Sequence, residues 1–411
     1  MRILFLTNFY PPLSRGGYEQ WCQEVTDELR TRGHDIHVLT SRHERDATSQ
    51  PEAEWIHRTL HLEMPFTSFS NGLLFFVNRT TREKENLAHL RRLIHDLEPD
   101  AVLVWGMWNL HRSLPALAEA LMPGRVVYYI GDYWPTLPSQ HEFYWQAPGR
   151  HWTTRGLKKL LGIPARQLLR RQERPPLAFA HALFPTAFLR DELKRKRVAF
   201  QKTQIIYGAI DTSLYSYRNR AGAARPLSLL YAGRLTHEKG VHTAIKALGK
   251  LVHKHGIRTI NLTIAGSGSA EYEAHLRQLA QKEQVEQLVT FLGPQPKEAM
   301  PALYDQADVL LFTSLWHEPF GRVLIEAMAS GVVIIGTATG GAAEILVENE
   351  NALVFPPGDA VTLAAQIARL IETPKLRQRL AQAARESTLD KFDLNRMATE
   401  IESYCERWLE I

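Results

Sequence analysis

Hydrophobic and polar positions follow two alternating patterns along this chain. Short runs of aliphatic and aromatic residues predict buried strands at Arg2 to Thr7, Ile36 to Thr40, Ala101 to Trp105 and Val126 to Ile130. Between the first two runs, Gly17 to Arg32 has apolar residues at helical spacing and is followed by a glycine, which predicts a helix. Strands that alternate with amphipathic helices are typical of an α/β fold, in which helices cover both faces of a parallel sheet.

The same alternation begins again near residue 227. Strands are predicted at 227–231, 259–265, 289–292, 309–313 and 332–336, and helices at 241–255, 270–281, 297–306 and 320–330. We therefore predict two doubly wound, Rossmann-like domains, 1–210 and 211–392, joined through the polar stretch 211–226. A final amphipathic helix within 393–411 fits against either domain. Because ligands of such folds bind beyond the carboxyl ends of strands, we expect the active site in a cleft between the two domains.

The composition excludes several classes of protein. The 411 residues are enough for two domains, and 45% hydrophobic with 23% charged residues is typical of globular chains rather than disordered or fibrous ones. No apolar run is long enough to cross a bilayer, and we interpret the apolar first residues as a buried strand rather than a signal peptide. Cys22 and Cys405 are the only cysteines, which favours a reducing, cytoplasmic location.

Two loops that follow predicted strands carry residues suited to a phosphorylated ligand. Gly16 and Gly17 precede a helix, where adjacent glycines let a phosphate approach backbone amides at the positive end of the helix. The alternative for this pair is a plain tight turn. Arg234 and Lys239 lie five residues apart across a turn, so both cations can converge on one anion. The alternative there is a solvated charged loop.

A third loop contains Glu318 and Glu326. Pro319 fits the first turn of a helix, so Glu318 is expected just before the helix and Glu326 about two turns into it. Carboxylates accept hydrogen bonds from sugar hydroxyls, so one glutamate can hold a hexose and the other a ribose. The start of this helix also offers backbone amides to a phosphate or a hexose, at Phe320, Gly321 and Arg322.

Gly16-Gly17, Gly233-Arg234-(x4)-Lys239-Gly240 and Glu318-(x7)-Glu326, in this order, resemble the retaining family-4 glycosyltransferases of the GT-B fold. The resemblance covers nearly the whole chain and is more specific in its second half. It implies that Gly17 contacts the donor phosphate, that Arg234 and Lys239 bind the diphosphate, that Glu326 holds the ribose and that Glu318 holds the transferred sugar. It also implies that further segments border the nucleotide: Gly266-Ser267, Gly293-Pro294 and, with less weight, Glu344.

One departure from the family pattern concerns the acceptor side. Many relatives place a histidine near the reacting sugar, at the position where this chain has Gly131. Asp132, His111 or Asn109 are the candidates to replace it, and for His111 a surface or helix-start histidine is the alternative. Tyr133, Trp134 and Trp145 lie in nearby loops, where aromatic rings suit either an acceptor sugar or core packing. For Trp105, within a strand, we favour core packing.

Much of the positive charge lies in residues 150–174. The chain has a net charge of +5, and this segment contains eight Arg and Lys residues against Glu173 alone, with leucines between them. It predicts basic amphipathic helices that bind an anionic membrane, which would suit a lipid-linked acceptor and a peripheral location on the inner face of the membrane. The alternative is a solvated helical face. No nucleic-acid-binding module surrounds the segment, so nucleic acid is not an expected partner.

The resemblance implies retaining transfer of a hexosyl group from a nucleoside-diphosphate sugar to a hydroxyl of a glycan or lipid-linked glycan. A UDP-sugar is the favoured donor, with GDP- and ADP-sugars as alternatives. No Asp-x-Asp, His-Glu-x-x-His or cysteine cluster occurs, so we expect neither a metal ion nor another cofactor. Two further readings stay open, a UDP-sugar 2-epimerase and an inactive protein that binds a glycan or a nucleotide.

Overall fold

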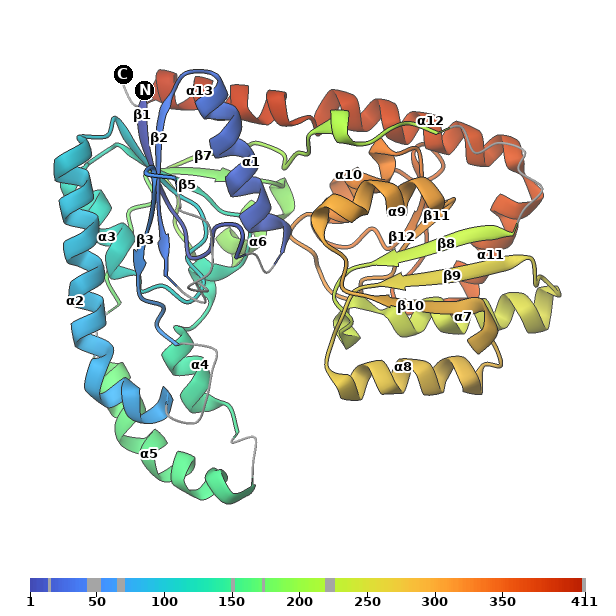
Figure 1. Cartoon of the computed structure of the whole chain (residues 1–411), viewed down its shortest axis with the longest axis horizontal. Coiled ribbons are helices and arrows are strands. Elements are labelled where there is room, and N and C mark those ends of the chain that lie inside the picture. Colours follow the sequence, from blue (N-terminus) through green and yellow to red (C-terminus); the bar gives the residue numbers. More distant parts are fainter. Residues whose placement is uncertain are drawn as a thin grey trace. The chain divides into compact units, whose positions relative to one another are not determined.

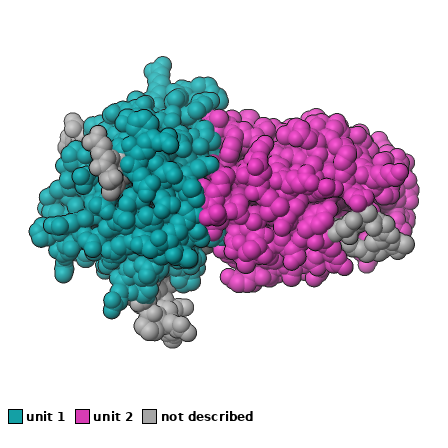
Figure 2. All heavy atoms as spheres, turned by 90° about the horizontal axis from the view of Figure 1, so that it is seen from above, with its two compact units in different colours: residues 1–185, 189–206, 398–411 teal, residues 186–188, 207–397 magenta. Residues whose placement is uncertain are grey.

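The computed structural model describes residues 1–13, 16–42, 53–64, 71–148, 152–171, 174–218 and 226–408 (Figure 1). The chain divides into two compact units (Figure 2). Unit 1 comprises Met1–Pro185, Leu189–Ile206 and Ala398–Ile411, and unit 2 comprises Thr186–Phe188 and Tyr207–Met397. Each unit has one sheet in which all strand pairs are parallel, so the predicted α/β fold class is confirmed.

Unit 1 has a seven-stranded sheet in the order β3-β2-β1-β4-β5-β6-β7. Its strands are β1 (Arg2–Leu6), β2 (Asp35–Ser41), β3 (Ile56–Leu60), β4 (Ala101–Val104), β5 (Val126–Tyr129), β6 (His181–Phe184) and β7 (Lys202–Ile205). Its helices are α1 (Gly17–Thr31), α2 (Asn71–Leu97), α3 (Ser113–Leu121), α4 (Gln140–Gln146), α5 (Trp152–Arg171) and, from Leu189 on, α6 (Ala187–Arg195). A short 3-10 turn, η1 (Trp134–Thr136), precedes α4.

The continuous apolar runs of the sequence form the middle of this sheet. β1, β4 and β5 are buried on both faces, which is why their sequences do not alternate with polar residues. Alternate residues such as Leu4, Leu6, Val102 and Val104 point into one core with α2 and α3, whereas α1 covers the opposite face (Figure 1).

Unit 2 has a six-stranded sheet in the order β10-β9-β8-β11-β12-β13. Its strands are β8 (Leu227–Ala232), β9 (Ile260–Ala265), β10 (Val289–Gly293), β11 (Val309–Phe312), β12 (Val333–Gly336) and β13 (Ala352–Val354). Its helices are α7 (Val241–His255), α8 (Ala270–Lys282), α9 (Met300–Gln306), α10 (Arg322–Ala329), α11 (Ala360–Glu372) and α12 (Pro374–Lys391). The 3-10 turns are η2 (Thr212–Leu214), η3 (His237–Lys239), η4 (Glu286–Leu288), η5 (Lys297–Ala299) and η6 (Gly341–Glu344).

The core of unit 2 follows the same rule. Alternate strand residues, among them Leu229, Tyr231 and Ile264, pack with the apolar faces of α7, α8 and α11. Helices α9 and α10 lie on the other face of the sheet (Figure 1). In both units the first strand, β1 or β8, lies inside the sheet. The next two strands of the chain extend the sheet on one side of it, and the later strands extend it on the other side. Loops that follow these strands therefore lie at the point where such sheets bind ligands.

The last helix, α13 (Leu394–Trp408), joins unit 1 from Ala398 on. Glu402 accepts hydrogen bonds from both His34 Nε2 (2.6 Å) and Arg32 Nη1 (2.8 Å), and the Tyr404 hydroxyl lies 3.0 Å from His181 Nδ1 on β6. Cys405 is buried in the same helix, and both cysteines are free thiols. These contacts attach the end of the chain to unit 1.

No helix in the described part of the chain is both long enough and apolar enough to span a membrane.

The contacts of Glu402 predict a pH-dependent contribution to stability. Burial opposes ionisation of this carboxyl group, but the hydrogen bonds from His34 and Arg32 outweigh it and hold its pKa below the usual range. The contribution is therefore present above the pKa of the unfolded chain and is lost as the pH falls through the lower pKa of the folded protein. We expect Glu402→Gln to lower the free energy of unfolding by about 1 kcal/mol at pH 7 and by less at pH 4.

Urea unfolding followed by tryptophan fluorescence measures this difference, because eight of the nine tryptophans belong to unit 1. Glu406→Gln, an exposed position on the same helix, is the matched control and should have no comparable effect. Equal effects of the two substitutions at both pH values would show that the Glu402 contacts do not stabilise unit 1.

Candidate active site

The loops at the carboxyl edge of the unit 2 sheet pack backbone against backbone. A Cβ atom on Gly266 would lie 1.8 Å from the Gly233 carbonyl oxygen, and one on Gly268 would lie 2.0 Å from the Leu235 carbonyl oxygen. Gly266 also has a φ of +146°, which L side chains rarely adopt. These glycines let the loop after β8 lie directly on the loop after β9, with Leu235 N donating to Ser267 O at 2.8 Å.

The loop after β11 is held from both sides. On one side, Thr313 Oγ1 donates to Lys239 O (2.8 Å), and a Cβ atom on Gly240 would lie 2.0 Å from Thr313 O. On the other side, Glu318 pairs with Gly340 in a parallel β-bridge, and Gly341 N donates to Glu318 O at 2.7 Å. The backbone positions of residues 239 and 318 are thereby fixed relative to each other, although they lie far apart in the sequence.

This packing brings Lys239 and Glu318 together. Lys239 Nζ lies 2.5 Å from Glu318 Oε1, and Ser314 Oγ donates to the same oxygen at 2.9 Å. The Glu318 side chain is 8% exposed and that of Lys239 is 20% exposed, so the pair is largely shielded from water. The Lys239 ammonium group also lies 5.9 Å from the centroid of the Trp316 ring. Ser314 and Trp316 are site residues that the sequence reasoning missed.

Arg234 lies in the same loop as Lys239 and is exposed. Gly233 before it has a φ of +150°. The hydroxyl of buried Tyr231 donates to Arg234 O at 2.8 Å, which fixes the backbone from which the guanidinium extends. This edge of unit 2 therefore presents Arg234 as an exposed cation and Lys239 as a cation paired with a carboxylate.

Glu326 is held by two neighbours within unit 2. Arg322 Nε donates to its Oε1 and the Tyr304 hydroxyl donates to its Oε2, each at 2.8 Å. The prediction that the helix begins at Pro319 is wrong, since α10 begins at Arg322. Gly321, with a φ of +125°, is the residue before the helix, and such a conformation cannot be part of an α-helix. Glu326 is therefore only about one turn into α10.

The remaining predicted donor-side residues contribute mainly backbone. Phe320 is 3% exposed and its ring packs against Phe392, so its side chain is part of the core. Gly293 O accepts from Gly266 N at 2.8 Å, and Pro294 beside it is exposed. Glu344 accepts hydrogen bonds from the backbone N–H groups of Ala187 (3.1 Å) and Phe188 (2.7 Å) and from the Tyr207 hydroxyl (3.2 Å). These hydrogen bonds give Glu344 a role in holding the start of α6 and Tyr207 in place.

In unit 1, Gly16 and Gly17 lie at the start of α1, after the interior strand β1. The next residue, Tyr18, explains the glycine at 131. A Cβ atom on Gly131 would lie 2.4 Å from Tyr18 Cε2, so the tyrosine ring fills the space that a side chain at 131 would need. The Tyr18 hydroxyl donates to the carbonyl oxygens of Trp105 (2.7 Å) and Tyr129, which locks the ring between β4 and β5.

The three candidates to replace a histidine at 131 differ in their surroundings. Asn109 is buried and clamps Met64, with hydrogen bonds to the Met64 carbonyl oxygen and N–H at 2.8 and 2.9 Å. His111 Nδ1 lies 3.0 Å from Glu83 Oε1. Burial opposes a charged imidazole there, but the hydrogen bond to Glu83 and nearby carboxylates outweigh it and raise the pKa of His111.

Asp132 remains the candidate with an unusual titration. Burial raises the pKa of its carboxyl group to about 6, against the hydrogen bond that Trp134 N donates to Oδ1 at 2.8 Å. Tyr133 next to it is half-buried, and the Lys196 ammonium lies 4.9 Å from its ring centroid.

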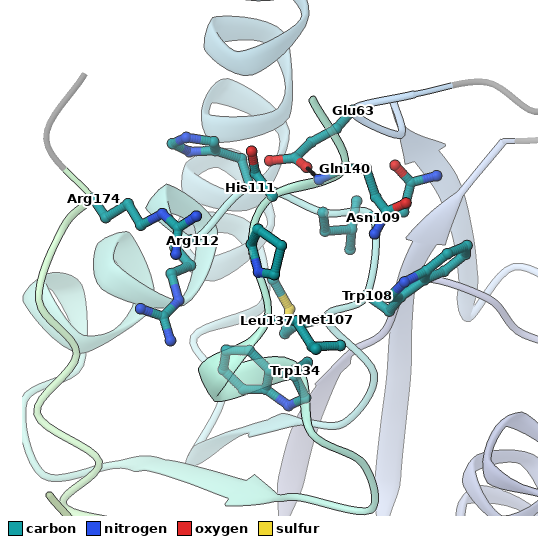
Figure 3. A pocket seen from close by; sticks show the side chains of 13 residues that line it. Glu63, Met107, Trp108, Asn109, His111, Arg112, Trp134, Leu137, Gln140 and Arg174 are labelled. Carbon is teal, nitrogen blue, oxygen red and sulfur yellow. Dashed lines mark hydrogen bonds between the residues drawn. The ribbon is translucent and has the colours of Figure 1, made fainter. Parts of the chain in front are cut away.

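The aromatic residues of this region are mainly packed. Trp105 is fully buried and stacks on Tyr129 at 4.3 Å between ring centroids. Trp145 is buried against Phe75, so core packing accounts for it. Trp134 is 5% exposed, yet it lies at the edge of a pocket in unit 1 that is formed by the loops after β3, β4 and β5 (Figure 3).

Comparison with known proteins agrees with this picture. Residues 15–214 match the family described as Glycosyltransferase Family 4, and residues 218–387 match that described as Glycosyl transferases group 1. The chain is 27% identical to a glycogen synthase of Mycobacterium tuberculosis, over 97% of this chain and 93% of that protein.

Solved structures show the same fold. Sucrose-phosphate synthase from Thermosynechococcus elongatus superimposes with a TM-score of 0.72 at 18% identity, covering 98% of each chain. HepE of Anabaena, solved in complex with UDP and glucose, superimposes with a TM-score of 0.69 at 20% identity, covering 99% of this chain and all of that one.

Two doubly wound units with this arrangement of loops define the GT-B glycosyltransferases. The family models together cover nearly the whole chain, and the chain belongs to family 4 of these enzymes. It is a glycosyltransferase, as the resemblance predicted.

The loop packing of unit 2 leads to a stability prediction. Gly266→Ala introduces both an unfavourable φ and a contact with the Gly233 carbonyl group, so we expect it to destabilise unit 2 by more than about 2 kcal/mol. Gly256→Ala is the matched control, because its φ is +66° and no atom lies within 4 Å of the added Cβ; it should cost about 1 kcal/mol. Scanning calorimetry measures both, and an equal loss of stability would mean that the loops do not need this close approach.

Proposed function

We propose that the chain transfers a hexosyl group, with retention and without a metal ion, from a nucleoside-diphosphate sugar to a hydroxyl of a glycan or lipid-linked glycan. The observation that carries this proposal is the shielded Lys239–Glu318 pair at the edge of the unit 2 sheet, with exposed Arg234 in the same loop. It combines positive charge for a diphosphate with a carboxylate that accepts hydrogen bonds from sugar hydroxyls.

The proposed reaction needs no side-chain nucleophile. The acceptor oxygen forms a bond to C1 of the donor sugar while the bond from C1 to the diphosphate oxygen breaks. The electron pair of that bond goes to the diphosphate, and the proton of the acceptor hydroxyl passes to the same leaving group. Arg234 and Lys239 would stabilise the negative charge that develops there, and Glu318 would hold the sugar.

UDP is the favoured nucleotide of the donor. HepE, which shares this fold, was solved with UDP and glucose, and this likeness supports trying UDP-glucose first. The carboxylate of Glu326 would accept hydrogen bonds from the ribose hydroxyls while Arg322 and Tyr304 keep it in place.

Lys239→Ala tests the proposed leaving-group role. Removing a preorganised cation should lower kcat by on the order of 10²–10³-fold, because the charge on the departing diphosphate is then less stabilised. The assay follows release of UDP from UDP-glucose, with UDP-galactose, GDP-mannose and ADP-glucose in parallel reactions.

Lys246→Ala, on the exposed side of α7, is the control and should leave kcat unchanged. A Lys239→Ala enzyme with near-normal kcat would contradict the proposed role. Formation of an epimeric sugar nucleotide in place of UDP release would instead identify a 2-epimerase.

A second feature bears on the acceptor and on location. In α5, Leu160 is 66% exposed and Ile163 is 60% exposed, and Leu157 and Leu168 are exposed as well. Helical spacing places Leu157, Leu160 and Leu168 on one stripe, and exposed Ile163 lies between this stripe and exposed Lys159 and Arg166. The third side of α5, with Ala165 and Leu161, packs on Trp145 and its neighbours.

An exposed apolar stripe beside basic residues is typical of helices that lie in a membrane interface. We propose that α5 binds an anionic bilayer, with its leucines among the acyl chains and its Lys and Arg residues at the lipid phosphates. Such contact would keep the enzyme peripheral on the inner face of the membrane, close to a lipid-linked acceptor. Arg150 of the predicted basic segment lies outside the described residues.

Flotation with vesicles tests this proposal. The protein should float with vesicles that contain phosphatidylglycerol but not with pure phosphatidylcholine, and added salt should weaken binding, because each basic residue contributes about 1 kcal/mol near an anionic surface. Leu160→Gln with Ile163→Gln should abolish flotation.

Leu214→Gln, at an exposed leucine of unit 2, is the matched control and should have no effect. Absence of flotation at low salt, or equal flotation of the α5 variant, would show that α5 does not bind the bilayer.

A further inference from the structure

The pocket in unit 1 has an uneven distribution of charge. It is lined by parts of three loops that follow strands: Glu63 after β3, residues 107–112 after β4 and residues 134–140 after β5, together with Arg174. In Figure 3 the side chains of Arg112 and Arg174 lie on one side and Glu63 and Gln140 lie across from them, with His111 between and with Leu137 and Met107 lower in the view, beside Trp134. A pocket with an apolar floor and polar groups at opposite ends is typical of a site for a small polar ligand.

The basic side holds a guanidinium without a counter-ion. In the described ranges, Arg112 forms no ion pair, and its Nη2 donates only to the Pro135 carbonyl oxygen at 2.5 Å. Burial lowers the pKa of Arg112, and the nearby charge of Arg174 lowers it further, although Arg174 itself is paired with Glu142. Two neighbouring guanidinium groups repel each other, and an anion between them removes that repulsion.

The opposite side holds the carboxyl group of Glu63. Glu63 is half-buried, and one of its oxygens accepts from Gln140 N at 2.7 Å. Burial raises the pKa of Glu63, although the nearby charges of His111 and Arg174 act to lower it. His111 is also paired with Glu83, and Asn109 is engaged with Met64. The Glu63 carboxyl group keeps lone pairs beyond the one that Gln140 N uses. These lone pairs suit the hydroxyl of a sugar or another polyol.

We propose that this pocket binds the acceptor, and that the acceptor carries an anionic group, a phosphate or a carboxylate, held by Arg112 and Arg174 while one of its hydroxyls donates to Glu63. This inference rests on the proposed transferase function and adds a class of acceptor to it. A guanidinium binds a phosphate or carboxylate through two parallel hydrogen bonds, which gives orientation as well as affinity. Trp134, whose ring lies 5.7 Å from the Arg112 guanidinium, holds that group in place.

Calorimetric titration of the full chain tests the proposal with three soluble probes: glucose, glucose 6-phosphate and glucuronate. We expect at least one of the charged sugars to bind about 10-fold or more tightly than glucose, and the tighter of the two identifies the anionic group. Arg112→Gln should weaken binding of that sugar by about 10- to 100-fold and leave glucose unaffected, because only the hydrogen bonds to the anion are lost.

Arg125→Gln, at an exposed arginine of unit 1 outside the pocket, is the matched control and should bind all three probes as the unsubstituted chain does. Equal affinity for charged and neutral sugars, no binding of any probe at millimolar concentrations, or an unchanged affinity in Arg112→Gln would each overturn the proposal. UDP is titrated into the same samples. If UDP binds and the charged sugars do not, the acceptor proposal alone fails, whereas a lack of UDP binding contradicts the transferase function itself.

Discussion

The close approach of backbone loops at the carboxyl edge of the unit 2 sheet is the constraint on which the proposed donor site depends. The loop after β8 can lie on the loop after β9 only because Gly266 and Gly268 have no side chains, and the loop after β11 can lie on both of its neighbours only because residues 240 and 340 are glycines. This packing fixes the backbone positions of residues 239 and 318 relative to each other. The Lys239–Glu318 pair is then a result of the fold and does not require either side chain to be ordered by a ligand.

At the equivalent edge of the unit 1 sheet, a side chain and not a second loop fills the space beside a glycine. The Tyr18 ring fills the volume beside Gly131, and its hydroxyl is hydrogen-bonded to backbone carbonyl groups. Neither residue therefore offers a ligand the side-chain hydrogen bond that a histidine at position 131 would provide. The polar groups that remain open lie farther along the same edge, in the pocket between Glu63 and Arg112. Specificity for the acceptor is therefore expected to come from the loops after β3, β4 and β5, which are the parts of such folds that vary most easily.

The sequence predicts nine of the described strands of this fold and misses four short ones. β4, β11 and, after Arg2, β1 are buried on both faces and appear as uninterrupted apolar runs, and in β8 only Ser228 interrupts the run. The edge strands β3 and β7 are only half-buried, and their mixed sequences carry no such pattern, so they were missed. The short strands β6 and β13 were missed as well, β6 although all four of its residues are buried, whereas the edge strand β10 was predicted.

The site residues were also predicted only in part. Glycines and charges after strands are visible in the sequence, but the contact of Lys239 with Glu318 joins loops after two different strands, and the Tyr18 ring beside Gly131 depends on packing across 113 positions. The start of α10 at Arg322 follows from the φ of Gly321, which the Pro319 signal conceals.

The central claim is that the edge of unit 2 binds a nucleoside diphosphate, and calorimetric titration of the full chain with UDP, GDP and ADP tests it most directly. The account predicts saturable binding of UDP and a clear loss of affinity in Glu326→Gln, whose carboxylate would hold the ribose. Binding at 100 times the Kd should also stabilise the fold by about 2.7 kcal/mol, which a thermal shift detects. If none of the three nucleotides bound, or if Glu326→Gln bound UDP as tightly as the unsubstituted chain, the assignment of this edge as the donor site would be contradicted.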